Sequence, residues 1–206
     1  MGRVQGYVTQ DVVRAARTVF WEHGFEGAAL PVLEGATGLN RSSIYHAFGS
    51  KRGLFDAAVA SYLDEIVRPR LRPLTLTDVA PDALATYLLG LRAALAEPAS
   101  FTAVNGCLLL NAAGAPIARD AAVRDAVAAY RAELLAAFAA GVRARHPDET
   151  GDGVERLAQA CTALVVSALA LTRVDHEGAL SSLDSALALV EHGTRSQVEP
   201  QRLKLT

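Results

Sequence analysis

The stretch Gly38-Leu39-Asn40-Arg41-Ser42-Ser43-Ile44-Tyr45-His46-Ala47-Phe48-Gly49-Ser50-Lys51 decides the fold of this chain. Gly38 breaks one short helix, and Asn40 is suited to cap the next because its side chain can accept a hydrogen bond from a free backbone N–H. Gly49 and Ser50 reopen the chain before Lys51 begins a further helix. The pattern predicts a tight turn and a short helix over 41–48, with a cation directly after it.

The short helix has one apolar and one polar side. Ile44 and Phe48 share a face because they are one helical turn apart, and Leu39 joins them from the turn. We expect these three side chains to pack onto the first helix of the chain. The side chains left on the outward side are Arg41, Ser42, Ser43, Tyr45 and His46.

That outward set matches what a helix needs in the major groove of DNA. Arg41 can make a bidentate contact to guanine, and the short serines let the backbone approach. No acidic residue lies between positions 35 and 55, whereas Lys51 and Arg52 add positive charge. Taken alone, Tyr45 could be a packing residue and Lys51 a solvated charge, but their order and spacing favour a reader of double-stranded DNA. The predicted DNA contacts are Arg41, Ser42, Ser43, Tyr45, His46 and Lys51.

The composition favours a helical protein without membrane contact. Of the 206 residues, 51% are hydrophobic and only 6% aromatic, a mixture that suits closely packed helices better than sheets. The net charge of -2 excludes a chain coated in basic residues but allows a local basic patch. The N-terminus lacks the apolar core of a signal peptide, and the most apolar run, 160–172, is short for a membrane span. We therefore expect a cytoplasmic protein.

Helix is the only recurring signal along the chain. About nine helices are predicted, at 9–24, 31–37, 41–48, 51–67, 80–96, 101–114, 118–145, 153–174 and 178–193, followed by a polar tail from Gln197. Pro69 and Pro73 are expected to end the fourth helix and to open a connector over 69–80. The predicted fold class is all-α: an N-terminal three-helix helix-turn-helix domain, 1–50, and a larger C-terminal helical bundle, 51–206, bridged by the fourth helix.

Residues 9–57 resemble the DNA-binding domain of the TetR family of transcriptional regulators. The residues that carry the resemblance are Ala16, Phe20, Gly24-Phe25, Leu33, Gly38-Leu39, Ser42, Ile44-Tyr45, Phe48, Lys51 and Leu54. The resemblance implies that helix 41–48 reads the groove, that Tyr45 and Lys51 hold phosphates, and that 51–206 binds a ligand and dimerises. It also implies a non-enzymatic repressor, released from a palindromic operator by a small effector, with no cofactor expected.

The chain departs from the family pattern around the second helix. Ala28 and Ala29 stand where family members carry hydroxyl residues that cap this helix and can touch phosphate. Glu34 stands where the family has a small residue. This carboxylate would be costly if buried and would repel DNA if exposed, unless it pairs with Arg41 or another cation. We therefore expect the DNA contacts to depend heavily on Arg41.

Two helices near the C-terminus carry narrow apolar seams that suit a dimer. The helix-turn-helix domain over 1–50, which we call the reader, is small. A DNA-binding domain of this size gains affinity and specificity when two copies bind half-sites one helical turn apart. Apolar residues recur at spacings of three and four in both helices, which suits a four-helix interface between subunits, and the family resemblance implies the same place. Packing within one subunit is the alternative. The predicted interface residues are Leu157, Cys161, Leu164, Ala168, Leu171, Leu180, Leu183, Leu187 and Val190.

The middle helices mix aromatic, aliphatic and sparse polar side chains, as the lining of a helix-bundle pocket does. The candidate ligand-binding residues are Tyr87, Leu91, Phe101, Cys107, Leu108, Asn111, Tyr130, Leu134, Phe138 and Leu164. No charged residue lies deep in these apolar faces, which favours a neutral or hydrophobic effector. Core packing without a ligand is the alternative for each of them.

Three other functions compete with an effector-controlled regulator. A sensor of electrophiles or oxidants would use Cys107, whose segment 105–111 resembles part of one TetR branch, but apolar surroundings without a basic neighbour favour a packing thiol. A DNA-binding dimer without any effector is the second alternative. A helical enzyme is the third, and it is disfavoured because the sequence carries no catalytic or metal-binding motif.

Overall fold

A computed structural model of the chain describes residues 2–193, with side chains from Thr9 to Gly193; the predicted tail from Gln197 lies outside this range. All regular structure within the range is helical, as the sequence predicts. The helices are α1 (Gly2–Gly27), α2 (Leu30–Thr37), α3 (Arg41–Phe48), α4 (Lys51–Tyr62), α5 (Arg68–Leu71), α6 (Ala83–Ala96), α7 (Phe101–Asn105), α8 (Leu108–Ala113), α9 (Ala121–Arg145), α10 (Gly151–Leu171) and α11 (His176–His192). The shorter turns are η1 (Leu63–Val67, π-helical), η2 (Arg72–Leu74, 3₁₀) and η3 (Pro116–Arg119, 3₁₀).

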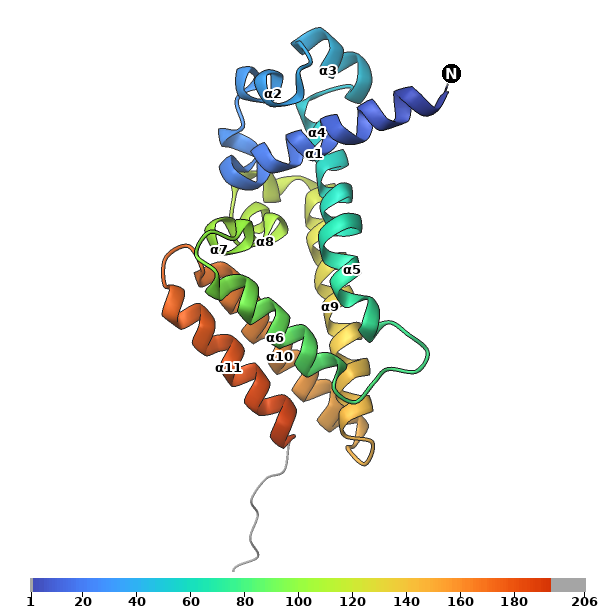
Figure 1. Cartoon of the computed structure of the whole chain (residues 1–206), viewed down its shortest axis with the longest axis vertical. Helices are drawn as coiled ribbons and strands as arrows, with labels where there is room; N and C mark the ends of the chain where they lie inside the picture. Colours follow the sequence, from blue (N-terminus) through green and yellow to red (C-terminus); the bar gives the residue numbers. More distant parts are fainter. Residues whose placement is uncertain (1, 194–206) are drawn as a thin grey trace, which may run out of the picture.

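The first three helices form one end of the molecule, and the remaining helices form a bundle below them (Figure 1). An aromatic core holds this end together: the Phe20 ring meets the Phe55 ring of α4 edge-on, with 5.1 Å between centroids. Leu33 of α2 and Ile44 of α3 have no exposed surface and belong to the same cluster. α2 packs mainly on α1 and α3 mainly on α4, and this packing stabilises two helices that are too short to be stable alone.

The first helix changes direction at Gly24, where the sequence predicts its end. Gly24 has a φ of 69°, in the left-handed region that glycine adopts without a steric penalty. Helical geometry resumes for a short turn up to Gly27, which extends α1 beyond the predicted end. The bend places Phe25 next to the aromatic core, with its ring centroid 5.3 Å from that of Phe55.

The expectation that Pro69 ends the fourth helix is wrong. The backbone widens into the π-helical turn η1, in which the Arg68 N–H donates to Leu63 O. Pro69 then lies in the first turn of α5, where its missing N–H costs little. The rod continues through η2 to Leu74, so the connector begins later than predicted, at residue 75.

The predicted helix over 101–114 is divided into α7 and α8. Gly106 separates them with a φ of 66°. A Cβ built on Gly106 would lie 2.7 Å from Leu169 O of α10, so the chain approaches α10 too closely for any side chain at this position. Asn105, Gly106 and Cys107 are all buried at this break.

The central bundle packs α10 between α9 and α11, with α6 beside α11 (Figure 1). Two segments, 101–119 and Gly151–Leu171, are long and apolar enough to cross a membrane by length and composition alone, more than the run 160–172 indicated. The first is interrupted by the break at Gly106. Packing within the subunit buries 50% of the first window and 44% of the second, so it accounts for part of their apolar character.

The number of helices agrees with the prediction over the part of the chain that the structure describes. α4, η1 and α5 form one continuous rod, and α7 and α8 form one interrupted helix. Counted in this way, the described residues form the nine predicted helices.

We predict that Gly106→Ala destabilises the protein strongly. The substitution combines a backbone conformation that costs a residue with a Cβ about 1–3 kcal/mol with a close contact that costs about another 1–3 kcal/mol. Urea denaturation measures the loss. Gly90→Ala in α6 is the matched control, because a Cβ there meets nothing within 4 Å, and the change should stabilise by up to about 1 kcal/mol. Equal stability of the two variants would contradict the role of Gly106.

Candidate functional site

The short helix α3 is positioned as the sequence predicts. Asn40 caps it, since the Asn40 side chain accepts a hydrogen bond from the Ser43 N–H at 2.9 Å. Ile44 is fully buried, and Phe48 and Leu39 are half-buried against the same core. The opposite side of α3 is therefore the side that can meet a partner.

The predicted DNA-contacting residues of α3 lie on that outer side. Arg41, Ser42 and His46 are exposed, whereas Ser43 and Tyr45 are half-buried. The Arg41 guanidinium lies over the Tyr45 ring, 5.3 Å from its centroid. This cation–π contact supports the long Arg41 side chain and keeps it at the helix surface.

Lys51 follows at the start of α4. Its ammonium lies over the Phe25 ring, 4.7 Å from the centroid, and burial lowers the pKa of Lys51 from its usual value. The Ser50 hydroxyl caps α4 by accepting a hydrogen bond from the Gly53 N–H at 3.0 Å. The first residue of α4 is thus a lysine whose side chain is already partly ordered by its contact with Phe25.

The local field is smaller than the count of cations suggests. Arg52 pairs with Asp56 on α4 at 2.9 Å and with Asp120, the residue that caps α9. Burial opposes ionisation of Asp120, but Arg52 and two backbone N–H groups together hold its pKa below the usual value. Arg52 therefore ties the reader to the bundle, and the positive field of the outer side rests mainly on Arg41 and Lys51.

Glu34 caps α3, a role that the sequence analysis did not assign to it. Its carboxylate accepts a hydrogen bond from the backbone N–H of Arg41, at the first turn of α3. A negative charge at a helix N-terminus also interacts favourably with the helix dipole. The expected loss of a hydroxyl at the start of α2 is confirmed, because Ala29 is the capping residue and makes no side-chain cap bond.

Ion pairs that the sequence analysis missed join α1 to the rod. The Arg17 guanidinium donates to the Ser61 hydroxyl at 2.8 Å and pairs with Glu65 at 2.8 Å. Arg14 reaches the same carboxylate at 2.9 Å. Hydrogen bonds from Arg14 and Arg17 outweigh burial and lower the pKa of Glu65. Because Glu65 is 48 and 51 residues away from these arginines in sequence, no local pattern indicates the pairs.

The candidate ligand-binding residues are distributed between a groove and the core. Tyr87 and Leu91 line a groove of about 560 Å³ between α5 and α6, together with Arg70 and Gly90. The other candidates do not line that groove. Cys107, Leu108, Leu134 and Phe138 are at most 1% exposed, Tyr130 is 3% exposed, Asn111 and Leu164 are half-buried, and Phe101 is 37% exposed beside Trp21.

The Cys107 thiol and the phenols of Tyr62 and Tyr130 meet in the core, near the phenol of Tyr87 that lines the groove. The Cys107 thiol donates to the Tyr130 hydroxyl at 3.8 Å, and burial together with Cys107 raises the pKa of Tyr62 and Tyr130. Burial also raises the pKa of Tyr87 to about 12. All three phenols are therefore neutral at physiological pH. The phenols of Tyr62 and Tyr130 pair with the Cys107 sulfur atom, which is a weak hydrogen-bonding partner.

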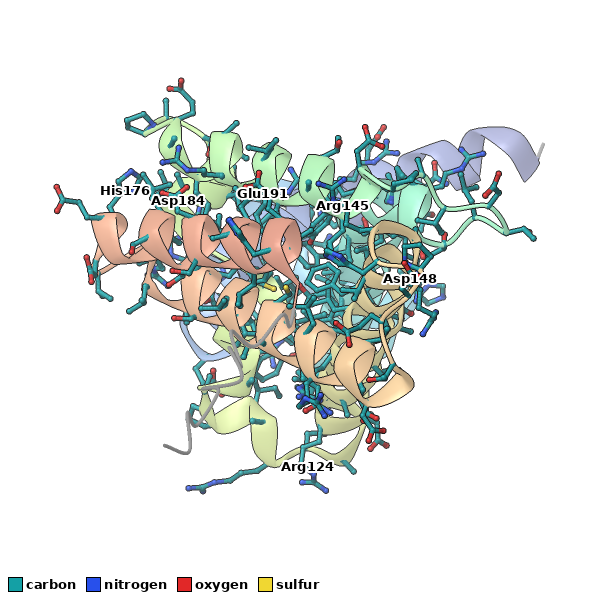
Figure 2. All side chains as sticks on the ribbon, turned by 90° about the horizontal axis from the view of Figure 1, so that it is seen from below. Arg124, Arg145, Asp148, His176, Asp184 and Glu191 are labelled. Carbon is teal, nitrogen blue, oxygen red and sulfur yellow. The ribbon has the colours of Figure 1, made fainter. Side chains whose placement is uncertain are left out.

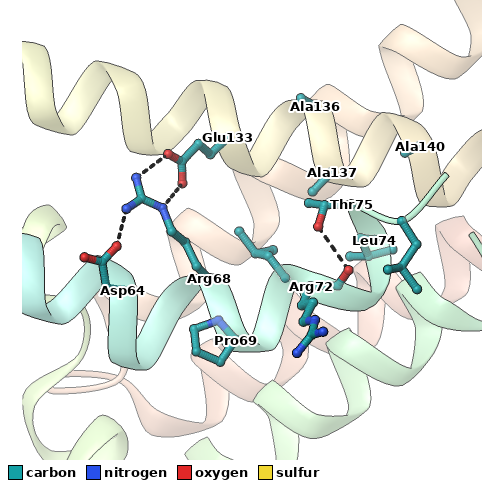
Figure 3. Close-up of a pocket in the computed structure, with 12 residues that line it drawn as sticks. Asp64, Arg68, Pro69, Arg72, Leu74, Thr75, Glu133, Ala136, Ala137 and Ala140 are labelled. Atoms are coloured by element: carbon teal, nitrogen blue, oxygen red, sulfur yellow. Dashed lines mark hydrogen bonds and ion pairs between the residues drawn. The ribbon is translucent and has the colours of Figure 1, made fainter.

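A second groove lies on the other side of the rod, between α5 and α9 (Figure 3). It has a volume of about 800 Å³; Leu71 and Leu74 line one side, and Ala136, Ala137 and Ala140 of α9 line the other. Arg68 closes one end by pairing with Glu133 of α9 at 2.7 Å and with Asp64. None of the candidate ligand-binding residues lines this groove.

Burial divides the predicted interface residues of α10 and α11 into two groups. Leu157, Cys161, Ala168, Leu183 and Val190 are at most 2% exposed, so they lie in the core of the subunit. Their burial agrees with the alternative of packing within one subunit. Leu164, Leu171, Leu180 and Leu187 keep part of their surface. Figure 2 shows α10 and α11 side by side; Asp184 of α11 pairs with Arg92 of α6.

Comparison with known proteins agrees with this geometry. Residues 12–58 match the family model described as "Bacterial regulatory proteins, tetR family". A solved TetR family transcriptional regulator, a cysteine mutant of CifR complexed with 26bp double-strand operator DNA, is 33% identical with a TM-score of 0.70. The similarity covers 87% of this chain and 95% of CifR.

The chain belongs to the TetR family of transcriptional regulators. Members of this family are helix-turn-helix regulators and not enzymes. The reduced form of Escherichia coli NemR shares the TetR fold, with a TM-score of 0.74 at 17% identity, over 90% of this chain and 95% of that one.

Curated relatives described as HTH-type transcriptional repressors match part of the chain. The repressor AcnR of Corynebacterium glutamicum is 50% identical over 46 residues, which cover 22% of this chain and 24% of AcnR. The repressor ComR of Escherichia coli is 28% identical over 61% of this chain and 62% of its own length. The chain thus spans less than two thirds of the length of these relatives.

We predict that the Glu34 carboxylate stabilises the reader as a cap. Glu34→Ala should lower the free energy of unfolding by about 1 kcal/mol, because the Arg41 N–H loses its acceptor. Glu34→Gln keeps an oxygen acceptor in place and should cost less. Urea denaturation at an unchanged slope measures both. A Gln variant as unstable as the Ala variant would contradict a capping role.

Proposed function

We propose that this TetR-family protein is a repressor that binds a palindromic operator as a homodimer in the cytoplasm. The observation that carries the proposal is the outer side of α3, which presents Arg41, Ser42, Tyr45 and His46. The inner side of the same helix packs in the core. The operator-bound CifR structure supports it through 33% identity over most of both chains. In this reading residues 1–50 read DNA and residues 51–206 bind an effector and dimerise.

Each DNA-contacting side chain has a role that follows from its position. Arg41 at the first turn of α3 is suited to guanine, because its guanidinium is held at the surface by Tyr45. Tyr45, Ser42, Ser43 and Lys51 are suited to phosphates and sugars. Lys51 costs little entropy on binding because Phe25 already supports its ammonium.

A second copy of the chain completes the reader. Two-fold symmetry would place two α3 helices about 34–36 Å apart, one turn of DNA. We propose that the partner covers the open side of α10 and α11, through Leu164, Leu171, Leu180 and Leu187. Val174, in the turn between these helices, is 81% exposed and extends the same apolar surface.

The effector is proposed to be a small neutral or hydrophobic molecule that enters between α5 and α6. That groove is lined by two of the candidate residues, Tyr87 and Leu91, and by the small residues Ala83, Gly90 and Ala94. The phenol of Tyr87 in this lining offers a hydrogen-bond donor without charge. Binding there would separate α5 from α6 and move the α4 rod that carries the reader.

The structure does not favour the thiol-sensor alternative. Cys107 has no exposed surface, so an electrophile would have to open the core to reach it. Burial raises the pKa of Cys161, the other cysteine, to about 11. A DNA-binding dimer without an effector differs from our proposal only in the groove, and a ligand test separates the two.

We predict that Arg41 and Lys51 contribute differently to DNA binding. Arg41→Ala should relax sequence preference at one base pair, a loss of about 1–3 kcal/mol of discrimination. Lys51→Ala should weaken all sequences alike and reduce the salt slope by about 1. Fluorescence anisotropy with selected and scrambled duplexes, at several salt concentrations, measures both quantities.

Arg145→Ala is the control for these two variants, because Arg145 is an exposed arginine at the far end of α9 (Figure 2). It should leave affinity and salt slope unchanged. A uniform loss of affinity from Arg41→Ala, with sequence preference intact, would argue against base reading by Arg41.

We predict that filling the α5–α6 groove blocks the effector. Gly90→Leu projects a side chain into space that is empty around its Cβ. A library of neutral apolar compounds is screened by thermal shift against the wild type. Any compound that raises the melting temperature should do so less with Gly90→Leu and equally with Ala136→Leu, which fills the other groove. The reverse pattern would place the effector between α5 and α9.

A further inference from the structure

Three backbone carbonyls at the end of α7 accept hydrogen bonds from side chains of three separate parts of the chain. The Thr172 hydroxyl, just after α10, donates to Ala103 O at 3.1 Å. The Asn111 amide of α8 donates to Asn105 O at 2.8 Å. The Trp21 indole N–H of α1 donates to Gly106 O at 3.1 Å. A helix end leaves such carbonyls without intrahelical partners, and here side chains from all around satisfy them.

Trp21 is the only one of these three donors that belongs to the reader. Its side chain is 6% exposed and its ring lies edge-on between Tyr62 of α4 and Phe101 of α7, with 4.8 Å between centroids in both pairs. The indole therefore spans the boundary between the reader and the bundle. It packs on both and hydrogen-bonds to the bundle.

The acceptor lies one peptide away from the buried thiol and phenols. Gly106 precedes Cys107, whose thiol contacts Tyr130, and the phenol of Tyr62 interacts with the same thiol while its ring packs on Trp21. Gly106 itself has little room to shift toward α10, because even a Cβ at this position would collide with Leu169 O. The thiol–phenol cluster is thus connected to Gly106 O through the backbone at Cys107 and to the Trp21 ring through Tyr62.

We infer that the hydrogen bond from Trp21 to Gly106 O, together with the carbonyl bonds beside it, couples the bundle to the DNA reader through α1; we call this set of bonds the latch. This route reaches the reader through α1, in addition to any movement of the α4 rod. It rests on the proposed function, since operator binding is the property that it controls. The structure shows the latched form, in which Arg14 and Arg17 also hold α1 to the rod through Glu65. Release of the latch lowers operator affinity.

A double-mutant cycle tests the coupling without a known effector. Trp21→Phe keeps an aromatic ring against Tyr62 and Phe101 but removes the donor, and Thr172→Val removes a bond at the break without touching the reader. The probe is a duplex that the wild-type protein selects from a randomised library. Each single variant should weaken binding of this duplex about 3- to 10-fold. Thr172→Val should change affinity less than about twofold in the Trp21→Phe background, because the latch is already lost.

Thr162→Val is the matched control. Thr162 is a buried threonine on α10 whose hydroxyl bonds to Ala158 O of the same helix, at 2.8 Å. It should leave affinity for the selected duplex unchanged. Equal effects of Thr172→Val in both backgrounds, or an effect of Thr162→Val as large as that of Thr172→Val, would overturn the proposal. Melting temperatures confirm that every variant is folded.

The chain carries a single tryptophan, so its fluorescence reports on the latch directly. Trp21 contacts the bundle and not the outer side of α3, yet the selected duplex should shift its emission, and a scrambled duplex should not. The proposal requires both this shift and the coupling in the cycle, and the absence of either one overturns it. If the wild-type protein selects no duplex, the proposed function itself is contradicted. Selection of a duplex without coupling in the cycle contradicts only the latch.

Discussion

Two neighbouring aromatic side chains on α1 join the core of the reader to the bundle. Phe20 and Trp21 point in directions about 100° apart, as successive residues on a helix do. Phe20 meets Phe55 and closes the core of the reader, while Trp21 meets Tyr62 and Phe101 and attaches that core to the bundle. The position of α3, and so of the DNA-contacting side chains, depends on this pair, since α3 is too short to be stable by itself.

The helix-turn-helix stretch of the reader could be predicted from local sequence because its caps and the two faces of α3 follow from neighbouring residues. The Asn40 cap, the inner face at Ile44 and the outward set beginning with Arg41 all follow from helical spacing within a few residues. The capping role of Glu34 was not predicted, although an acidic residue shortly before a helix is a visible signal. The bond that it makes depends on how the tight turn at Gly38 folds back.

The bundle was less predictable, because its departures from regular helix depend on neighbours far along the chain. Pro69 ordinarily ends a helix, but a π-helical turn ahead of it keeps the rod continuous. The sequence around Gly106 does not indicate that Leu169 O of α10 lies close to this glycine. Periodicity also does not distinguish an apolar face that packs inside one subunit from one that meets a partner. On α11, for example, Leu183 and Val190 are buried within the subunit, whereas the side chain of Leu187 is partly exposed.

The sequence by itself determined the fold class, the number of helices, the reader and its outward side chains, because helix caps, breakers and the 3.6-residue period act over a few residues. Only the tertiary structure decided which apolar residues are core, where the grooves lie and how the reader is attached. Those features arise from pairs such as Trp21 and Gly106, or Arg17 and Glu65, that are distant in the chain and meet only when the helices pack. A hydrogen bond to a backbone carbonyl, moreover, is invisible in sequence because every residue carries one.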